Sequence, residues 1–283
     1  MSLYRHIIAC NTCDLTNFQP FMVAGQQVGW VRHDLAARLE SWPEVFDLGG
    51  NQVSLRDSVG GVDDRTRAVA EICEALAQQD ILRPNRQEEF AVMQTFGDAP
   101  LMRLDRAWVS AFGVIAYGVH VNGYRETLSG PELWLGVRSA NNLVDPGKLD
   151  NMVAGGQPAG LSLLDNVVKE AEEEASVSEE LARQARPVSA INYVVEVAGG
   201  LRRDVLFAYD LPVPDGFQPI DRDGEHSSFS RVPAAEALRL VEKTDDFKFN
   251  VNLVIIDFAI RHGILQPDHP EYLKLVRGLR SGI

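Results

Sequence analysis

The chain has few cysteines, and their spacing excludes two common uses of this residue. Its 283 residues include only Cys10, Cys13 and Cys73, too few for a disulfide scaffold. Cys10 and Cys13 have the CxxC spacing of a zinc-ligand pair, but the sequence has no second pair to complete a zinc site. We therefore predict that the three are ordinary thiols, the first two near an N-terminal helix.

Basic residues are also scarce relative to acidic ones. The chain has 27 Lys and Arg against 40 Asp and Glu, which gives a net charge of −13. Binding to a nucleic acid requires clustered Lys and Arg, so this composition argues against it. A phosphate-bearing ligand would be repelled unless cations lined its pocket, and this favours a bound metal ion.

Long apolar segments are absent. No run approaches the roughly 20 apolar residues that cross a bilayer, and the first residues lack the core of a signal peptide. Hydrophobic residues make up 45% and charged residues 24%, as in ordinary globular proteins. We expect a cytoplasmic enzyme without a membrane partner. Nothing in the sequence predicts an oligomeric state.

The patterning of apolar residues predicts two regions that meet near residue 105. Residues 1–105 mix helices predicted at 4–14, 34–39 and 65–79 with a hairpin at 20–30 and a strand at 51–55. Residues 106–283 interleave strands predicted at 107–121, 132–138, 188–197, 204–211 and 227–232 with helices predicted at 163–175, 234–243, 250–262 and 270–280. This order predicts an α/β/α sandwich preceded by a smaller α+β domain.

The most informative segment combines a glycine pair with an acidic helix. The pair at 155–156 precedes the helix predicted at 163–175, which carries Glu170, Glu173 and Glu174. At about 100° per residue, Glu173 and Glu174 lie about 60° and 40° to either side of Glu170. Like charges at this spacing repel each other, and carboxylate oxygens suit Mg²⁺ or Mn²⁺. A metal site would explain the cluster, and a solvated acidic face is the alternative.

The same segment resembles the signature of the Nudix hydrolases. That signature reads Gly, five residues, Glu, seven residues, Arg-Glu, an aliphatic residue, any residue, Glu-Glu, any residue, Gly and an aliphatic residue. Counted from Gly155, five positions match: Glu170, Ala171, Glu173, Glu174 and Val177. Three depart: Leu161 stands for Glu, Lys169 for Arg and Ser176 for Gly. Lysine lacks the planar fork of arginine, and serine ends a helix in the left-handed conformation less readily than glycine.

Other runs resemble one subfamily more closely. Its members are Nudix enzymes of plant chloroplasts, yeast and bacteria that are similar to the Nudix part of fungal thiamin pyrophosphokinase fusions. The runs are 118–124, 149–156, 169–175, 203–207 and 252–258, and residues 21–30 resemble the extra N-terminal domain of these members. The resemblance implies hydrolysis of damaged thiamin diphosphate, in its oxy and oxo forms, to the monophosphate and phosphate.

The resemblance also suggests roles for individual acidic residues. Glu170, Glu173 and Glu174 would bind Mg²⁺ or Mn²⁺, and the Gly155 carbonyl would be a backbone ligand. One of these carboxylates, or Glu225, would deprotonate the attacking water. Glu225 lies in a loop where many Nudix enzymes place a further acid, and an ordinary turn residue is the alternative.

Three residues are candidates for contact with the small-molecule diphosphate substrate. Arg138 ends a predicted strand, and its guanidinium could clamp a phosphate with two hydrogen bonds. An exposed arginine at the end of a strand is the alternative. His120 and Asn122 lie beside glycine bends and could line the pocket, although a structural histidine is the alternative. The subfamily often has a lysine near position 142, where this chain has Asn142. We therefore expect one cationic contact to the substrate fewer than in those members.

Two other functions stay open at this stage. The substrate could be another diphosphate derivative, such as ADP-ribose or a dinucleotide. The departures at three signature positions also leave open a catalytically inactive Nudix fold that binds a ligand or a partner.

Overall fold

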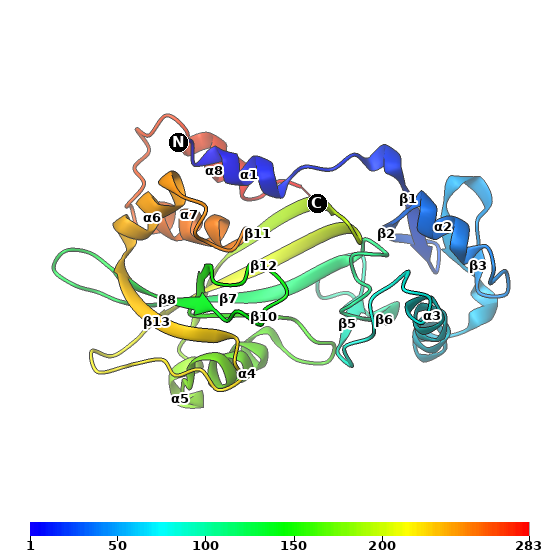
Figure 1. Cartoon of the computed structure of the whole chain (residues 1–283), viewed down its shortest axis with the longest axis horizontal. Helices are drawn as coiled ribbons and strands as arrows, with labels where there is room; N and C mark the ends of the chain where they lie inside the picture. Colours follow the sequence, from blue (N-terminus) through cyan, green and yellow to red (C-terminus); the bar gives the residue numbers. More distant parts are fainter. Residues whose placement is uncertain (283) are drawn as a thin grey trace.

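The computed structural model describes residues 1–282, and a seven-stranded sheet lies at its centre (Figure 1). The strand order is β11-β12-β7-β8-β13, with β10 paired to β7 and β9 paired to β8. The strands are β7 (Ile115–Arg125), β8 (Glu132–Arg138), β9 (Leu149–Asn151), β10 (Val153–Gly156), β11 (Arg186–Val197), β12 (Gly200–Pro212) and β13 (His226–Pro233). β7 and β12 are parallel, and the other pairs in this sheet are antiparallel.

Helices cover both faces of this sheet. One face carries α4 (Leu163–Ala175) and α5 (Glu179–Ala182), and the other carries α1 (Tyr4–Cys10), α6 (Ala234–Lys243), α7 (Val251–Arg261) and α8 (Tyr272–Gly278) (Figure 1). The predicted α/β class, with a layer of helices on each side of a sheet, is confirmed. Within residues 1–282, no helix combines the length and apolar character that a membrane span needs.

A smaller sheet lies in the part of the chain before β7. Its strand order is β2-β1-β4-β3, and a separate hairpin pairs β5 with β6. The elements are β1 (Phe18–Val23), β2 (Gln26–Arg32), α2 (His33–Leu39), β3 (Phe46–Asp47), β4 (Val53–Leu55), α3 (Val62–Ala77), β5 (Glu89–Val92) and β6 (Met102–Asp105), with single 3₁₀ turns at Leu15–Asn17, Gly49–Asn51 and Asp57–Val59. The predicted hairpin and strand, and the helices predicted at 34–39 and 65–79, lie among these elements.

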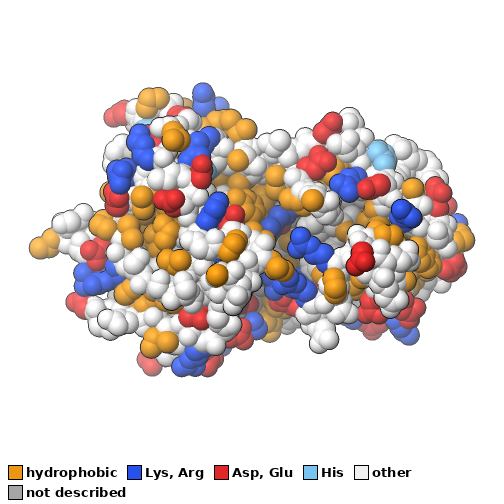
Figure 2. Space-filling model, viewed as in Figure 1, with side chains coloured by type: hydrophobic (Ala, Val, Ile, Leu, Met, Phe, Trp, Pro, Cys, Tyr) orange, Lys and Arg blue, Asp and Glu red, His pale blue; other side chains and the backbone are white. Residues whose placement is uncertain are grey.

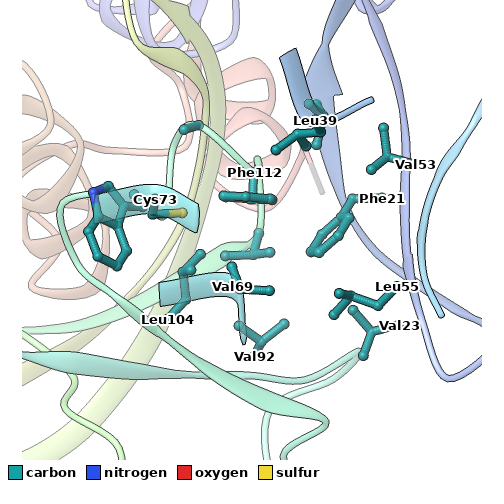
Figure 3. Close-up of a cluster of buried hydrophobic side chains, with 14 of the residues drawn as sticks. Phe21, Val23, Leu39, Val53, Leu55, Val69, Cys73, Val92, Leu104 and Phe112 are labelled. Atoms are coloured by element: carbon teal, nitrogen blue, oxygen red, sulfur yellow. The ribbon is translucent and has the colours of Figure 1, made fainter. Parts of the chain in front are cut away.

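The core of this part is apolar and extends past residue 105 (Figure 3). The Phe112 ring lies 5.0 Å from the Phe21 ring and 6.5 Å from the Phe46 ring, measured between centroids. The first helix, in contrast, packs against the last one. A Cβ on Gly278 of α8 would lie 2.6 Å from the side chain of Ile7 of α1. We therefore call residues 11–114 the N-terminal region, and residues 1–10 with 115–282 the sheet region. The domain division at residue 105 stays a prediction.

One sequence-based expectation for the elements was wrong. The strand predicted at 107–121 begins only at Ile115, because residues 107–113 form tight turns that bury Trp108 and Phe112. The Trp30 amide donates to the Phe112 carbonyl at 2.9 Å, and Gly113 has a positive φ of 54°. β5 and β6 were not predicted. Each has only four residues, and the two pair with each other in a separate two-stranded sheet.

Candidate functional site

The acidic helix α4 forms where the sequence predicts it. The Ser162 hydroxyl caps its first turn by accepting a hydrogen bond from the Asp165 amide at 3.1 Å. Ser176 ends the helix in the left-handed conformation, with φ 52°, and its hydroxyl donates to the Ile220 carbonyl at 2.6 Å. This bond holds a serine where the Nudix signature has glycine. The fully buried apolar side chains of α4 are Val167, Ala171 and Ala175.

Each glycine of the pair at the end of β10 makes room for a different neighbour. A Cβ on Gly155 would lie 2.2 Å from the carboxyl carbon of Glu170. A Cβ on Gly156 would lie 2.5 Å from the ring of Phe90, on β5. The first glycine therefore lets α4 bring its carboxylate onto the strand, and the second lets the N-terminal region pack against the same loop.

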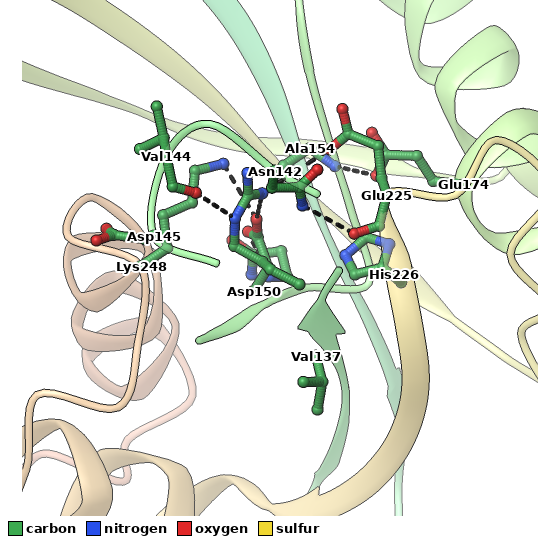
Figure 4. Close-up of polar contacts among 12 residues, drawn as sticks. Val137, Asn142, Val144, Asp145, Asp150, Ala154, Glu174, Glu225, His226 and Lys248 are labelled. Carbon is green, nitrogen blue, oxygen red and sulfur yellow. Dashed lines mark hydrogen bonds and ion pairs between the residues drawn. The ribbon is translucent and has the colours of Figure 1, made fainter. Parts of the chain in front are cut away.

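Glu170 and Glu174 are buried carboxylates that face this strand. Their exposed fractions are 8% and 2%. Burial raises the pKa of both groups, and the charge of Glu170 raises the pKa of Glu174 further. Glu174 accepts a hydrogen bond from the Ala154 amide at 2.9 Å (Figure 4). Two neighbouring acids in a low-dielectric environment favour a cation or a proton between them.

Glu173 is more exposed and is paired with Lys169. The Lys169 ammonium lies 2.8 Å from the Glu173 carboxylate and 3.1 Å from the Glu170 carboxylate. Burial acts to lower the pKa of Lys169, but the two carboxylates raise it overall. Lysine thus bridges two of the three predicted ligands without an arginine fork. Among residues 1–282, no three His, Cys, Asp or Glu side chains already converge into an ion cage.

Arg138 lies at the end of β8 in a buried ion-pair cluster. Its partners Asp150 and Val144 are labelled in Figure 4. Its Nη1 lies 2.6 Å from the Asp150 carboxylate, and its Nε donates to the Val144 carbonyl at 2.9 Å. Lys248 contacts the same carboxylate at 3.0 Å. Burial acts to raise the pKa of Asp150, but Lys248, His120 and Arg138 lower it to about 2. Sequence reasoning missed the roles of Asp150 and Lys248.

Glu225 lies just before β13, close to both Arg138 and Glu174. Its side chain is 44% exposed and lies 3.8 Å from Nη1 of Arg138. Its charge also contributes to the raised pKa of Glu174. The Glu225 carbonyl accepts hydrogen bonds from the Ser139 amide at 2.8 Å and the Asn142 side chain at 2.9 Å (Figure 4). Asn142 therefore positions this loop, and Lys248 supplies a cation that was not expected from the sequence.

His120 and Asn122 lie on the opposite face of β7, within a buried network. The His120 ring contacts the Asn151 side chain at 2.9 Å, and Asn151 donates to Asn122 at 2.9 Å. Asn122 donates in turn to Asp210 at 3.0 Å. Burial lowers the pKa of His120 to about 4, so the ring is neutral at pH 7. Both side chains have partners inside the sheet, and their contact with substrate stays a prediction.

Comparisons with known proteins cover both regions of the chain. Residues 2–116 match a family described as a domain of unknown function (DUF4743). Among solved structures, the NUDIX domain of Shewanella oneidensis NrtR, in a cocrystal with ADP ribose, has a TM-score of 0.42 and 17% identity, over 53% of this chain and 90% of that one.

Two plant proteins are similar over almost the whole chain. Nudix hydrolase 24, chloroplastic, of Arabidopsis thaliana is 40% identical over 270 residues, which cover 95% of this chain and 74% of that protein. Nudix hydrolase 20, chloroplastic, of the same plant is 39% identical over 290 residues, covering 98% and 77%. The cytoplasmic location expected for this chain stays a prediction. With about 40% identity over most of both relatives, and the carboxylates of α4 packed against a glycine pair, the chain belongs to the Nudix hydrolase family.

Proposed function

We propose that the chain hydrolyses damaged thiamin diphosphate, in its oxy or oxo form, to the monophosphate and phosphate with the help of a divalent metal ion. The observation that carries the reaction is the pair of buried carboxylates, Glu170 and Glu174, packed against β10 with raised pKa values. The thiamin substrate rests on the resemblance of several sequence runs to one Nudix subfamily. Mg²⁺ or Mn²⁺ is the proposed metal.

The groups at the site fit such an ion. Carboxylate oxygens are the donors that Mg²⁺ and Mn²⁺ prefer, and a cation would offset the cost of burying two acids. Glu170 and Glu174 would bind the ion. Glu173 would also bind the ion once its ion pair with Lys169 is broken. When bound, the ion neutralises phosphate charge and makes a coordinated water more acidic.

The strand pattern supports a second candidate for a backbone ligand at the same site. In an antiparallel strand, the N–H and C=O of one residue point to the same edge. The Ala154 amide points at Glu174, so the Ala154 carbonyl lies on that open edge of β10. The Gly155 oxygen instead lies toward β7, 2.9 Å from where a Cβ of Gly118 would be. The Ala154 carbonyl is therefore a further candidate for the backbone ligand, beside the Gly155 carbonyl that the resemblance implied.

Other residues of the chain would orient the substrate and accept a proton. Nη1 and Nε of Arg138 donate to Asp150 and Val144, so the remaining nitrogen, Nη2, can donate to a phosphate oxygen. Lys248, on the same carboxylate, adds positive charge beside it. Glu225 is partly exposed and near Arg138, which suits a base that takes a proton from the attacking water.

A substrate panel tests the proposal directly. Phosphate release would be measured for oxidised thiamin diphosphate, thiamin diphosphate, ADP-ribose and a dinucleotide, each with Mg²⁺, with Mn²⁺ and with a chelator. We expect the highest kcat/KM for the oxidised thiamin compound, and only with metal. Preference for ADP-ribose or the dinucleotide would identify the alternative substrate class. Metal-dependent binding without turnover of any compound would indicate a non-catalytic ligand-binding protein.

A pair of variants on one helix tests the role of the carboxylates. Glu170→Gln keeps the shape of the buried side chain and removes its charge, and we expect kcat to fall by about 10² to 10³. Glu172→Gln is the control, because this side chain is 65% exposed and faces Arg222. Unchanged turnover by Glu170→Gln would refute the metal-binding role of this residue.

A further inference from the structure

Strand register places an aromatic pair on the same face of the sheet as the carboxylates of α4. Gly155 on β10 is opposite Val119 on β7, and Val119 is opposite Phe207 on β12. Residues that pair in register point to the same face. The face that Gly155 turns toward Glu170 therefore also carries Phe207, about 10 Å away across two strand spacings. Tyr117, two residues before Val119, shares this face.

The N-terminal region adds a third ring to this pair. Phe96 lies in the loop between β5 and β6, and its ring centroid is 4.8 Å from those of Tyr117 and Phe207. The Tyr117 and Phe207 rings are 6.2 Å apart and nearly parallel. Tyr117 is buried, whereas Phe96 is 39% exposed. The ring of Phe96 is thus partly exposed to solvent beside the rings of Tyr117 and Phe207.

The hairpin that carries Phe96 is fixed directly to the glycine loop of the site. The Glu89 carbonyl on β5 accepts a hydrogen bond from the Ala159 amide at 2.8 Å. Phe90, the next residue, fills the space left by Gly156. Figure 2 shows a hollow between the two halves of the molecule on this view, bordered by hydrophobic and by Lys or Arg side chains. The position of Phe96 is therefore tied to that of the carboxylates.

We propose that Phe96, Tyr117 and Phe207 form a stacking surface for the flat ring of the substrate, so that the N-terminal region determines specificity. The inference rests on the proposed function, because it assumes a diphosphate at the carboxylates of α4. A ring joined to a diphosphate by a short linker spans the separation between the two sites. Aromatic rings prefer offset or edge-to-face partners, and an exposed phenyl ring provides one at low entropic cost.

Replacements at Phe96 separate stacking from simple packing. The variants are Phe96→Ala, Phe96→Leu and Phe96→Tyr, with Leu128→Ala as the control because Leu128 is a fully exposed apolar residue in the loop after β7. For the ring-bearing diphosphate that the wild type prefers, we expect KM to rise about tenfold in the alanine and leucine variants, with kcat within about twofold. Phe96→Tyr and Leu128→Ala should keep the wild-type KM. A wild-type KM in Phe96→Leu would overturn the proposal, because leucine replaces bulk but not a ring.

A binding titration distinguishes this inference from the proposed reaction. Oxidised thiamin diphosphate is titrated calorimetrically into each full-length protein with a chelator present, so that no turnover occurs. If the wild type binds this compound without hydrolysing it in the metal assay, the proposed reaction fails, and a weaker Kd in Phe96→Leu than in Phe96→Tyr still supports stacking. If the wild type hydrolyses it and all four variants keep the wild-type KM and Kd, only the stacking surface fails. A wild type that neither binds nor hydrolyses any ring-bearing diphosphate overturns both.

Discussion

The N-terminal region and the sheet region differ in what they bury. The N-terminal region encloses an apolar core around Phe21 and Phe112, and few of its polar side chains are buried: Gln19, Thr66 and Asp105. The sheet region buries many more, including His6, His120, Asn122, Arg138, Asp150, Asn151, Glu170, Glu174, Asp204, Asp210, His226, Asn250, Asn252 and Asp257. Several of these lie at the site, and His120, Asn151, Asn122 and Asp210 form a hydrogen-bonded network on the opposite face of β7.

This difference indicates where stability and function reside. Burial of apolar side chains stabilises a fold, whereas burial of charged groups costs free energy unless they are paired. Functional sites accept this cost because burial shifts pKa values and strengthens electrostatic contacts. The N-terminal region thus provides a stable support that contacts the site through one hairpin, and the sheet region carries the groups whose burial is unfavourable until a ligand binds.

The largest expected effect on stability lies in the N-terminal region. Phe112→Ala removes a fully buried ring that packs on Phe21 and Phe46, and we expect the free energy of unfolding to fall by about 3–5 kcal/mol. Urea denaturation followed by circular dichroism measures this change. The kcat should stay near the wild-type value at temperatures well below unfolding. A loss below about 1 kcal/mol would show that this core is not the support inferred here.

A further loss of activity, beside that of Glu170→Gln, is expected from the close approach of Gly155 to Glu170. Gly155→Ala would push this carboxylate away from β10, and we expect kcat/KM to fall about 10²-fold, as for a misplacement of about 1 Å. Gly199→Ala is the matched control, because a Cβ there meets open space. Both variants should keep the wild-type circular dichroism spectrum. Equal activity of the two would mean that Glu170 has room to move without cost.

What could be predicted from the sequence is mostly local. The helix at 163–175 has the predicted limits, because Ser162 and Ser176 act within one turn of its ends and its apolar stripe has helical spacing. The hairpin at 20–30 was likewise found from its glycine turn and alternating residues. Such features depend on residues that are close together in the chain, so the local sequence is enough to predict them.

What could not be predicted depends on distant partners. Lys248 joins the site through Asp150, which lies 98 residues earlier in the chain, and no spacing rule connects the two. Residues 107–113 looked like a strand because they are apolar, but a hydrogen bond from Trp30 and burial against Phe21 fix them as turns. The contact of Phe90 with Gly156 likewise joins two regions that the sequence treats separately.

A smaller effect is expected from the raised pKa of Glu174. The folded state holds its proton more tightly than the unfolded chain, so the resulting stabilisation is present below the ordinary carboxyl pKa and is lost as pH rises through the raised pKa. With metal chelated, the free energy of unfolding of Glu174→Gln should therefore be about 1 kcal/mol higher than that of the wild type near pH 8. Near pH 4 the two values should be equal. Urea midpoints at the two pH values measure this. A constant difference between the proteins would contradict the assignment, and so would greater stability of the wild type at high pH.

The smallest effect is expected at Cys13, beyond the end of α1. Cys13 is exposed, whereas Cys10 is buried against the sheet region, where burial raises its pKa to about 12. Neither thiol is poised to be a thiolate, so Cys13→Ser should change the free energy of unfolding by less than about 0.5 kcal/mol. Cys10→Ser, which places a hydroxyl in the core, should cost more. Stoichiometric zinc in the purified protein, lost in Cys13→Ser with more than about 1 kcal/mol of stability, would instead make the CxxC pair a metal site. The N-terminal end of the chain would then hold a polar site of its own, and the contrast between the two regions would be weaker than their buried residues suggest.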